Sequence, residues 1–177
     1  MKGYKVAGRY AQSLLEITED KGVTKEVVRD MEFLIKAVAE SRDFMVFLNS
    51  PIINPNRKND ILDKVFEDFQ ELTLGFIHLI TKNRREMLLP LIAEQFIAKV
   101  KEVNGIVPVT VTSAVKMEEG LRNQILSKLK QGIDGTIEIE EKVDPKLLGG
   151  FVVRMGDIRV DASVAHQLNE LKQRLTR

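Results

Sequence analysis

The residues from Ile137 to Leu175 form the most informative pattern in this chain. Apolar and polar residues first alternate with a period of two, which predicts β-strands, and the pair Gly156-Asp157 then predicts a tight hairpin turn whose first position needs a positive φ. The last apolar residues recur at helical spacing, which predicts an amphipathic helix ending near Leu175. This part of the chain therefore predicts a small mixed domain that ends in an amphipathic helix.

The predicted elements of this domain can be placed more closely. Asp144-Pro145 is a turn between two strands, and Asp161 and Ser163 can each cap the final helix. Upstream, the valines from Val107 to Val111 alternate with proline and threonines, which predicts a strand, and a helix with leucines from Leu121 to Leu129 follows it. The predicted order is β-α-β-β-β-α.

Before Gly105 the apolar residues recur at helical spacing, and breakers and caps divide them into six helices. Gly22 ends the first helix, Thr24 and Ser41 can cap the second and third, and Asn54-Pro55 places an N-cap before a proline at the first helical position. The sequence thus predicts an α+β protein. An N-terminal all-α six-helix bundle over residues 1–105 precedes a small mixed α/β domain over residues 106–177.

The first and fifth helices carry broad apolar surfaces, and that of the fifth is more than one neighbour can cover. The first presents small residues and Tyr10 beside Leu14 and Leu15, and small side chains allow a partner helix to approach closely. The fifth, from Leu72 to Ile80, is apolar around most of its circumference. A central position in the bundle and an external partner both explain that pattern.

Composition narrows the possible functions. The chain has 177 residues, a formal net charge of +1 and no cysteine, which argues against a nucleic-acid-binding protein, disulfides, thiolate nucleophiles and cysteine-based metal sites. His78 and His166 each lack a second ligand at metal-binding spacing, so no metal site is expected. No segment approaches the length of a membrane-spanning helix, and the N-terminus lacks a signal-type apolar core, so we expect a soluble, untargeted chain without membrane insertion.

The sequence contains no recognisable catalytic motif. A phosphate-binding loop, a nucleophile elbow and a zinc-protease string are all missing. Glu138 and Glu140 alternate with apolar residues, which is typical of the solvated face of a strand. The charged residues flanking the hairpin are expected to serve turns, capping and local ion pairs; they are Arg154, Asp157, Arg159 and Asp161. We therefore expect no enzyme and no cofactor.

The C-terminal pattern resembles the signature of the δ subunit of F-type ATP synthases, called the oligomycin-sensitivity-conferring protein in mitochondria. The residues that carry this resemblance are Ile137, Ile139, Val143-Asp144, Leu147, Gly149-Gly150, Phe151, Val153-Arg154 and Gly156. The N-terminal stretch Val6 to Ala11 is similar to that family's first helix, and Asn83 to Phe96 is similar to its fifth-to-sixth helix junction. The resemblance covers almost the whole chain.

This resemblance implies a non-catalytic stator subunit of an F-type ATP synthase, present as a monomer in one copy per complex. Such a subunit links the catalytic F1 head to the b subunits of the peripheral stalk and so supports ion-gradient-driven ATP synthesis. The absence of a presequence favours a peripheral subunit on the cytoplasmic face of a bacterial cell membrane, and a processed organelle protein would have a similar N-terminus.

The resemblance also implies two binding sites. A groove between the first and fifth helices would receive the N-terminal helix of an α subunit, and the residues expected there are Ala7, Tyr10, Ala11, Leu14, Leu74, Ile77 and Ile80. The C-terminal domain would contact the b subunits through the last helix, where the expected residues are Val164, Leu168 and Leu171.

Two other classes of function stay open at this point. A helical adaptor outside the synthase would share the groove but reject both the α-subunit helix and the b subunits. An enzyme with scattered active-site residues would need a polar pocket with convergent titratable groups, which an apolar groove does not provide.

Overall fold

In the computed structural model of the chain, the described residues are 2–130, 135–156 and 158–175. They divide into two compact units, Met1–Val100 and Lys101–Arg177. The division falls within the last helix before the sheet, which continues to Val103, whereas the sequence predicts a boundary after Gly105.

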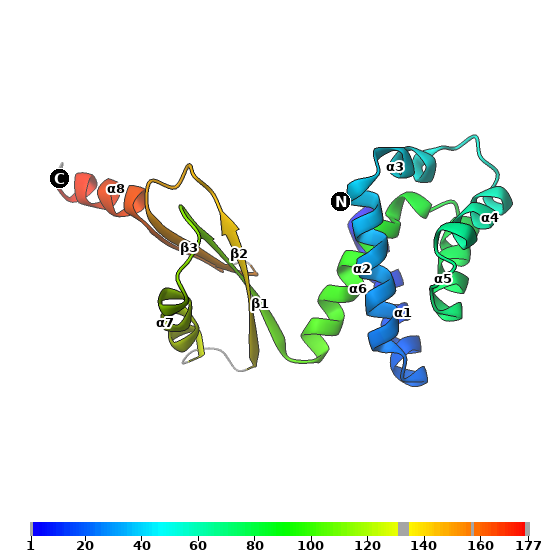
Figure 1. The fold of residues 1–177 in the computed structure, drawn as a ribbon, viewed down its shortest axis with the longest axis horizontal. Coiled ribbons are helices and arrows are strands. Elements are labelled where there is room, and N and C mark those ends of the chain that lie inside the picture. Colours follow the sequence, from blue (N-terminus) through cyan, green and yellow to red (C-terminus); the bar gives the residue numbers. More distant parts are fainter. Residues whose placement is uncertain (1, 131–134, 157, 176–177) are drawn as a thin grey trace. The chain divides into compact units, whose positions relative to one another are not determined.

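The N-terminal unit is built from helices (Figure 1). Within its described residues, the elements are α1 (Lys2–Lys21), α2 (Thr24–Glu40), α3 (Arg42–Asn49), α4 (Pro55–Val65), α5 (Glu71–Lys82), the short 3₁₀ helix η1 (Glu86–Leu88) and α6 (Leu89–Val103).

Local sequence signals explain most of these helix ends. Gly22, with a φ of 68°, follows the last residue of α1. The Ser41 side chain accepts a hydrogen bond from the Phe44 N–H at 3.2 Å, and the Asn54 side chain accepts one from the Asn56 N–H at 3.1 Å. The predicted cap at Thr24 is wrong: α2 already begins at that residue, and the preceding position makes no side-chain capping bond.

The helices of this unit surround one apolar core. Its fully buried members come from six helices and include Leu14, Leu34, Leu48, Leu62, Ile77 and Phe96. Burial of such side chains stabilises the fold by roughly 1.5–3 kcal/mol each. This core therefore fixes α1 and α5 in the same packed unit.

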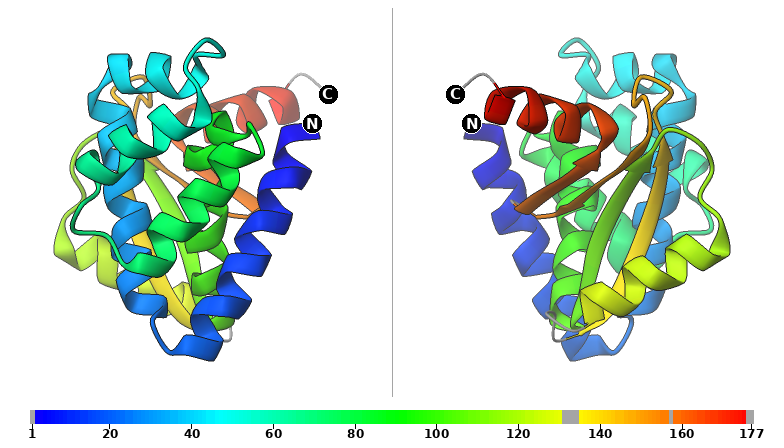
Figure 2. Two further views of the ribbon diagram at one scale, coloured as in Figure 1. Left: turned by 90° about the vertical axis from the view of Figure 1, so that its right-hand side faces the viewer. Right: turned by 90° about the vertical axis from the view of Figure 1, so that its left-hand side faces the viewer.

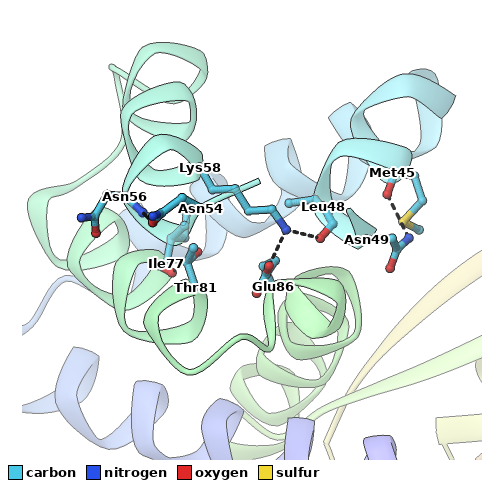
Figure 3. Close-up of polar contacts among 9 residues, drawn as sticks. All are labelled: Met45, Leu48, Asn49, Asn54, Asn56, Lys58, Ile77, Thr81 and Glu86. Atoms are coloured by element: carbon cyan, nitrogen blue, oxygen red, sulfur yellow. Dashed lines mark hydrogen bonds and ion pairs between the residues drawn. The ribbon is translucent and has the colours of Figure 1, made fainter. Parts of the chain in front are cut away.

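A buried ion pair ties three elements of this unit together (Figure 3). The side chain of Lys58, on α4, is 1% exposed, and its ammonium pairs with the carboxylate of Glu86, on η1. The same ammonium donates a hydrogen bond to the carbonyl oxygen of Leu48, at the end of α3, at 2.9 Å. Because a buried ammonium is costly without acceptors, these contacts fix the positions of α3, α4 and η1 relative to one another.

The C-terminal unit is a four-stranded sheet with two helices among its described residues. Its elements are β1 (Ile106–Ser113), α7 (Glu119–Lys130), β2 (Thr136–Val143), β3 (Gly150–Met155), β4 (Ile158–Ser163) and α8 (Val164–Leu175). The order β-α-β-β-β-α predicted from the sequence is confirmed, and the mixture of helix and sheet agrees with the predicted α+β class. Asp157, the second residue of the predicted hairpin turn, lies outside the described residues.

The strand order in the sheet is β2-β1-β3-β4. β1 lies parallel to β2, with Val109 opposite Ile139, and antiparallel to β3, with Val111 opposite Val153. β2 and β3 follow each other in the chain but are not neighbours, because β1 lies between them. α7 packs across one face of the sheet, where Ile125 is 6% exposed (Figure 2).

The glycine pair before β3 lies where two segments approach closely. Gly150 has a φ of 77°, and a Cβ atom there would lie 2.4 Å from the carbonyl oxygen of Ala162. Only glycine fits this position without displacing β4. Gly150 thus serves a close approach of two backbone segments.

Candidate partner-binding surfaces

The predicted groove residues of α1 and α5 are at different depths. Five of the seven have no exposed surface; they are Ala7, Ala11, Leu14, Ile77 and Ile80. Tyr10 and Leu74 are half-buried and pack against the core. A side chain without exposed surface cannot touch a docked helix, so in this structure the five buried residues support the two helices from beneath. Their role at a partner site stays a prediction.

Tyr10 joins the two helices directly. Its ring meets that of Phe76, on α5, edge to face with a centroid separation of 6.3 Å. Its hydroxyl oxygen accepts hydrogen bonds from the Arg85 guanidinium at 2.9 Å and the Asn83 amide at 3.5 Å. The guanidinium carbon also lies 5.7 Å from the centre of the Tyr10 ring. The side of α5 that bears Phe76 and Asn83 therefore faces α1.

These contacts identify one strip of residues on each helix. Spacings of four, three and four residues stay on one side of an α-helix. The strip on α1 that contains Tyr10 is Val6, Tyr10, Ser13 and Ile17, and the strip on α5 that contains Phe76 and Asn83 is Leu72, Phe76, Leu79 and Asn83. We call these eight residues the α1–α5 face.

The α1–α5 face offers apolar surface that the core does not cover. Ile17 is 44% exposed and Leu79 is 49% exposed, while Val6, Tyr10 and Leu72 are half-buried. Ile17, Leu72, Phe76 and Leu79 were not among the site residues expected from the sequence. Helical spacing from Tyr10 along α1 could have indicated Ile17. The residues on α5 could not be chosen without the Tyr10–Phe76 contact, which shows the side of α5 that faces α1.

The position of α5 depends on a carboxylate from α2. Asp30 accepts hydrogen bonds from the Gln70 N–H at 3.0 Å and from the Thr73 hydroxyl at 2.6 Å. Gln70 is the residue before the first turn of α5, and no side chain of its own caps that helix. Asp30 therefore satisfies an N–H at the start of α5 from another helix.

Neither histidine pattern in the sequence predicts a metal site, and the structure shows the surroundings of His78. The His78 ring nitrogen lies 2.6 Å from a carboxylate oxygen of Asp63, and both side chains are partly exposed. Among the described residues, no three side chains of the metal-binding types come together. No helix in the described part of the chain is both long and apolar enough to cross a bilayer.

On the last helix, Val164 is 41% exposed and Leu168 is 56% exposed. The side chain of Leu171 lies outside the described part of the structure. The two apolar side chains that can be assessed are thus available to a partner.

The start of α8 is fixed by local hydrogen bonds. The Ser163 hydroxyl oxygen accepts a bond from the His166 N–H at 3.2 Å, and Asp161 accepts one from the Ser163 N–H at 3.0 Å. Hydrogen bonds from the Ser163 hydroxyl, from its N–H and from Arg159 lower the pKa of the Asp161 carboxyl below its ordinary value. Of the two predicted caps, Ser163 bonds an N–H of α8, whereas Asp161 bonds the N–H of Ser163, which precedes the helix. The predicted local ion pairing is confirmed, with an Arg159–Asp161 separation of 3.0 Å.

The glutamates of β2 project from the sheet into solvent, as predicted. Glu138 and Glu140 are exposed, whereas Ile137 and Ile139 are half-buried. Glu138 pairs with Lys101, and Glu140 pairs with Lys142 at 3.4 Å. Each carboxylate thus has a cationic neighbour at the surface, an arrangement typical of a solvated strand face.

Comparison with known sequences decides the family. The sequence model described as the ATP synthase delta (OSCP) subunit matches residues 6–175, which includes both units. The chain belongs to this family. The resemblance carried by the N-terminal and C-terminal motifs is thereby confirmed.

Individual relatives agree with this assignment. The chain is 36% identical over 175 residues to the ATP synthase subunit delta of Christiangramia forsetii, covering 99% of this chain and 95% of that relative. It is 36% identical over 173 residues to the ATP synthase subunit delta of Carboxydothermus hydrogenoformans, covering 98% of each.

A solved structure shares the fold. A chain in the cryo-EM structure of the Toxoplasma gondii mitochondrial ATP synthase hexamer matches with a TM-score of 0.73 and 21% identity, over 97% of both chains. As a member of the δ family, the chain is a stator subunit of the peripheral stalk of an F-type ATP synthase. The alternative of an adaptor outside the synthase is not favoured.

Proposed function

We propose that this δ-family chain is a non-catalytic link between the F1 head and the b subunits. Its N-terminal unit holds the head, and its C-terminal unit holds the peripheral stalk. The observation that carries the proposal is the family match over residues 6–175, which extends across both units. A link of this kind needs buried apolar contacts at two separate places, because it transmits torque without chemistry.

At the head, the proposed ligand is the N-terminal helix of an α subunit. It docks on the α1–α5 face through contacts with Tyr10, Ile17 and Leu79, which have free apolar surface. The buried residues Ala7, Ala11, Leu14, Ile77 and Ile80 hold the two helices at the spacing that the ligand requires. Leu74 is half-buried on α5 and does not share the strip that faces Tyr10.

At the stalk, the proposed ligand is the end of the b subunits. The apolar stripe of α8 supplies the contact through Val164, Leu168 and Leu171. Support comes from the exposure of Val164 and Leu168, whose side chains are 41% and 56% exposed. One copy of the chain per complex, as a monomer, places both contacts on a single polypeptide on the cytoplasmic face of a bacterial membrane.

Reconstitution tests this function directly. Inverted membrane vesicles that contain the cognate synthase stripped of its δ subunit hydrolyse ATP without efficient ion pumping if the stator is broken. Adding the full chain is expected to restore ATP-driven pumping, measured with a pH- or sodium-sensitive dye, without adding hydrolytic activity of its own. Unchanged pumping after stoichiometric addition, or ATP hydrolysis by the purified chain, would contradict the proposal.

A further inference from the structure

The two ends of the α1–α5 face carry opposite charges. The helices run in opposite directions along it: Gly3, in the first turn of α1, lies against Leu88, just beyond the end of α5. The left view of Figure 2 shows the same opposed course of the two helices. One end of the face therefore combines the start of α1 with the end of α5, and the other combines the end of α1 with the start of α5.

The first of these ends is basic. Its exposed cations are Arg9, Lys82, Arg84 and Arg85. Within the described residues, none of the four takes part in an ion pair. The acidic residue in the same stretch, Glu86, is buried and paired with Lys58. The basic end thus keeps an uncompensated positive charge at the surface.

A cleft extends this basic end along α5. It has a volume of about 730 Å³ and is lined by Gly75, Leu79 and Lys82 of α5 together with Arg84. Its other wall comes from the first turns of α4, including Asn54 and its neighbours. The cleft joins the apolar Leu79 side chain to two cations, so it suits an amphipathic segment that ends in acidic residues.

The opposite end of the face is acidic. The exposed carboxylates beside it are Glu16 and Asp20 on α1 and Glu71 on α5, and they outnumber Lys21, the basic residue in the last turn of α1. Arg9, Glu16 and Asp20 are separated by seven and four residues, so they lie along one side of α1; Glu71 and Lys82, separated by eleven residues, do the same on α5. Along each helix the rim of the face therefore changes from positive to negative charge.

We propose that this charge gradient fixes the direction of the helix that docks on the α1–α5 face. The inference rests on the proposed function. The bound α-subunit helix places acidic residues beside Lys82, Arg84 and Arg85, and basic residues beside Glu16, Asp20 and Glu71. Acidic side chains are favoured in the first turn of a helix, and their full charges outweigh the partial positive charge of its dipole, so the ligand starts at the basic end and runs parallel to α1.

Site-specific disulfide trapping tests this direction. The chain contains no cysteine, so Lys82→Cys and Glu71→Cys each give the full-length chain a single thiol. The probe is a synthetic peptide of the cognate α-subunit N-terminus with one cysteine at its first or last position. In a glutathione buffer, the N-terminal cysteine is expected to couple about tenfold more to Lys82→Cys than to Glu71→Cys, and the C-terminal cysteine the reverse. Equal or reversed coupling would overturn the proposed direction.

Charge reversal supplies a second measurement. The double variant Lys82→Glu/Arg84→Glu is expected to weaken binding of the unmodified peptide by about tenfold at low salt. The matched control is Arg29→Glu/Lys36→Glu, which makes the same change in net charge on exposed positions of α2 and should alter binding less than about twofold. Equal effects of the two double variants would overturn the inference. An unmodified peptide that fails to bind the wild-type chain would instead refute the proposed function.

Discussion

Asp30 on α2 accepts a hydrogen bond from the main-chain N–H of Gln70, forty residues later, at 3.0 Å. The Thr73 hydroxyl donates to the same carboxylate oxygen at 2.6 Å. One nearly buried carboxylate thus serves as the cap that the start of α5 lacks in its own sequence. The Asp30 carboxylate therefore both stabilises the fold and helps to position α5, which forms one side of the α1–α5 face.

Replacing this carboxylate should destabilise the N-terminal unit. Asp30→Ala leaves the Gln70 N–H and the Thr73 hydroxyl without their acceptor, so the free energy of unfolding is expected to fall by about 2 kcal/mol. Urea denaturation followed by circular dichroism measures the change. The exposed Asp20→Ala serves as control, and an Asp30→Ala variant as stable as this control would show that the cap contributes nothing.

For the buried Lys58–Glu86 pair, we predict that the stability losses caused by mutating each residue are not additive. Lys58→Met leaves the Glu86 carboxylate buried without its cation, so the free energy of unfolding should fall by about 3 kcal/mol. The double variant Lys58→Met/Glu86→Leu removes both charges and should recover most of that loss. A double-mutant cycle from urea denaturation measures the coupling, and strictly additive losses would contradict a direct interaction.

Gly150 should tolerate no side chain. Gly150→Ala places a Cβ against the β4 main chain at a φ of 77°, so the β3–β4 pairing is expected to lose about 2 kcal/mol of stability. Hydrogen exchange of the β3 and β4 amides reports the loss. Gly120→Ala, on α7 with open space around it, should leave exchange unchanged or slightly slower. Similar protection in both variants would disprove the close approach.

The lowered pKa of Asp161 predicts an acid-sensitive start of α8. The hydrogen bonds from Ser163 favour the ionised carboxylate in the folded state, so this group contributes stability above its unfolded pKa of about 3.8. That contribution is lost as the pH falls through the lower folded pKa. Helical content of α8, followed by NMR between about pH 6 and pH 2, should therefore fall less steeply for Asp161→Asn than for the wild type. Parallel curves would refute this linkage.

The sequence predicted the helix ends well because their causes are local. Gly22, Ser41 and the Asn54-Pro55 pair act within a turn of their own position. The same local reasoning placed a cap at Thr24, where the helix begins without a side-chain cap. It also predicted the exposed glutamates of β2, since a period of two assigns them to one face.

Long-range relationships were beyond prediction from one sequence. The insertion of β1 between β2 and β3 depends on pairing across the sheet, and no local signal specifies it. Lys58 sits among polar residues of α4, so nothing in its neighbourhood in the sequence indicates burial. Its partner, Glu86, is 28 residues away.

In the candidate site, too, local features could be predicted from the sequence and long-range contacts could not. Helical spacing identified α1 and α5 as broadly apolar, but it could not separate Ala7 and Ala11, which are fully buried, from Ile17, which is exposed. That separation requires knowing which side of each helix faces the other. The contact between Tyr10 and Phe76 supplies it, and the two residues are far apart in the sequence.

The central claim is that the α1–α5 face binds an α-subunit helix, and calorimetric titration tests it most directly. The full chain is titrated with a synthetic peptide of the cognate α-subunit N-terminus, and the titration is repeated with Ile17→Asp, Leu79→Asp and the control Val46→Asp. Val46 is an apolar residue on α3, away from the face, and is 62% exposed. We predict saturable one-to-one binding that weakens by about tenfold or more for both face variants and stays unchanged for Val46→Asp. No binding by the folded wild-type chain, or equal affinity in all variants, would contradict the account.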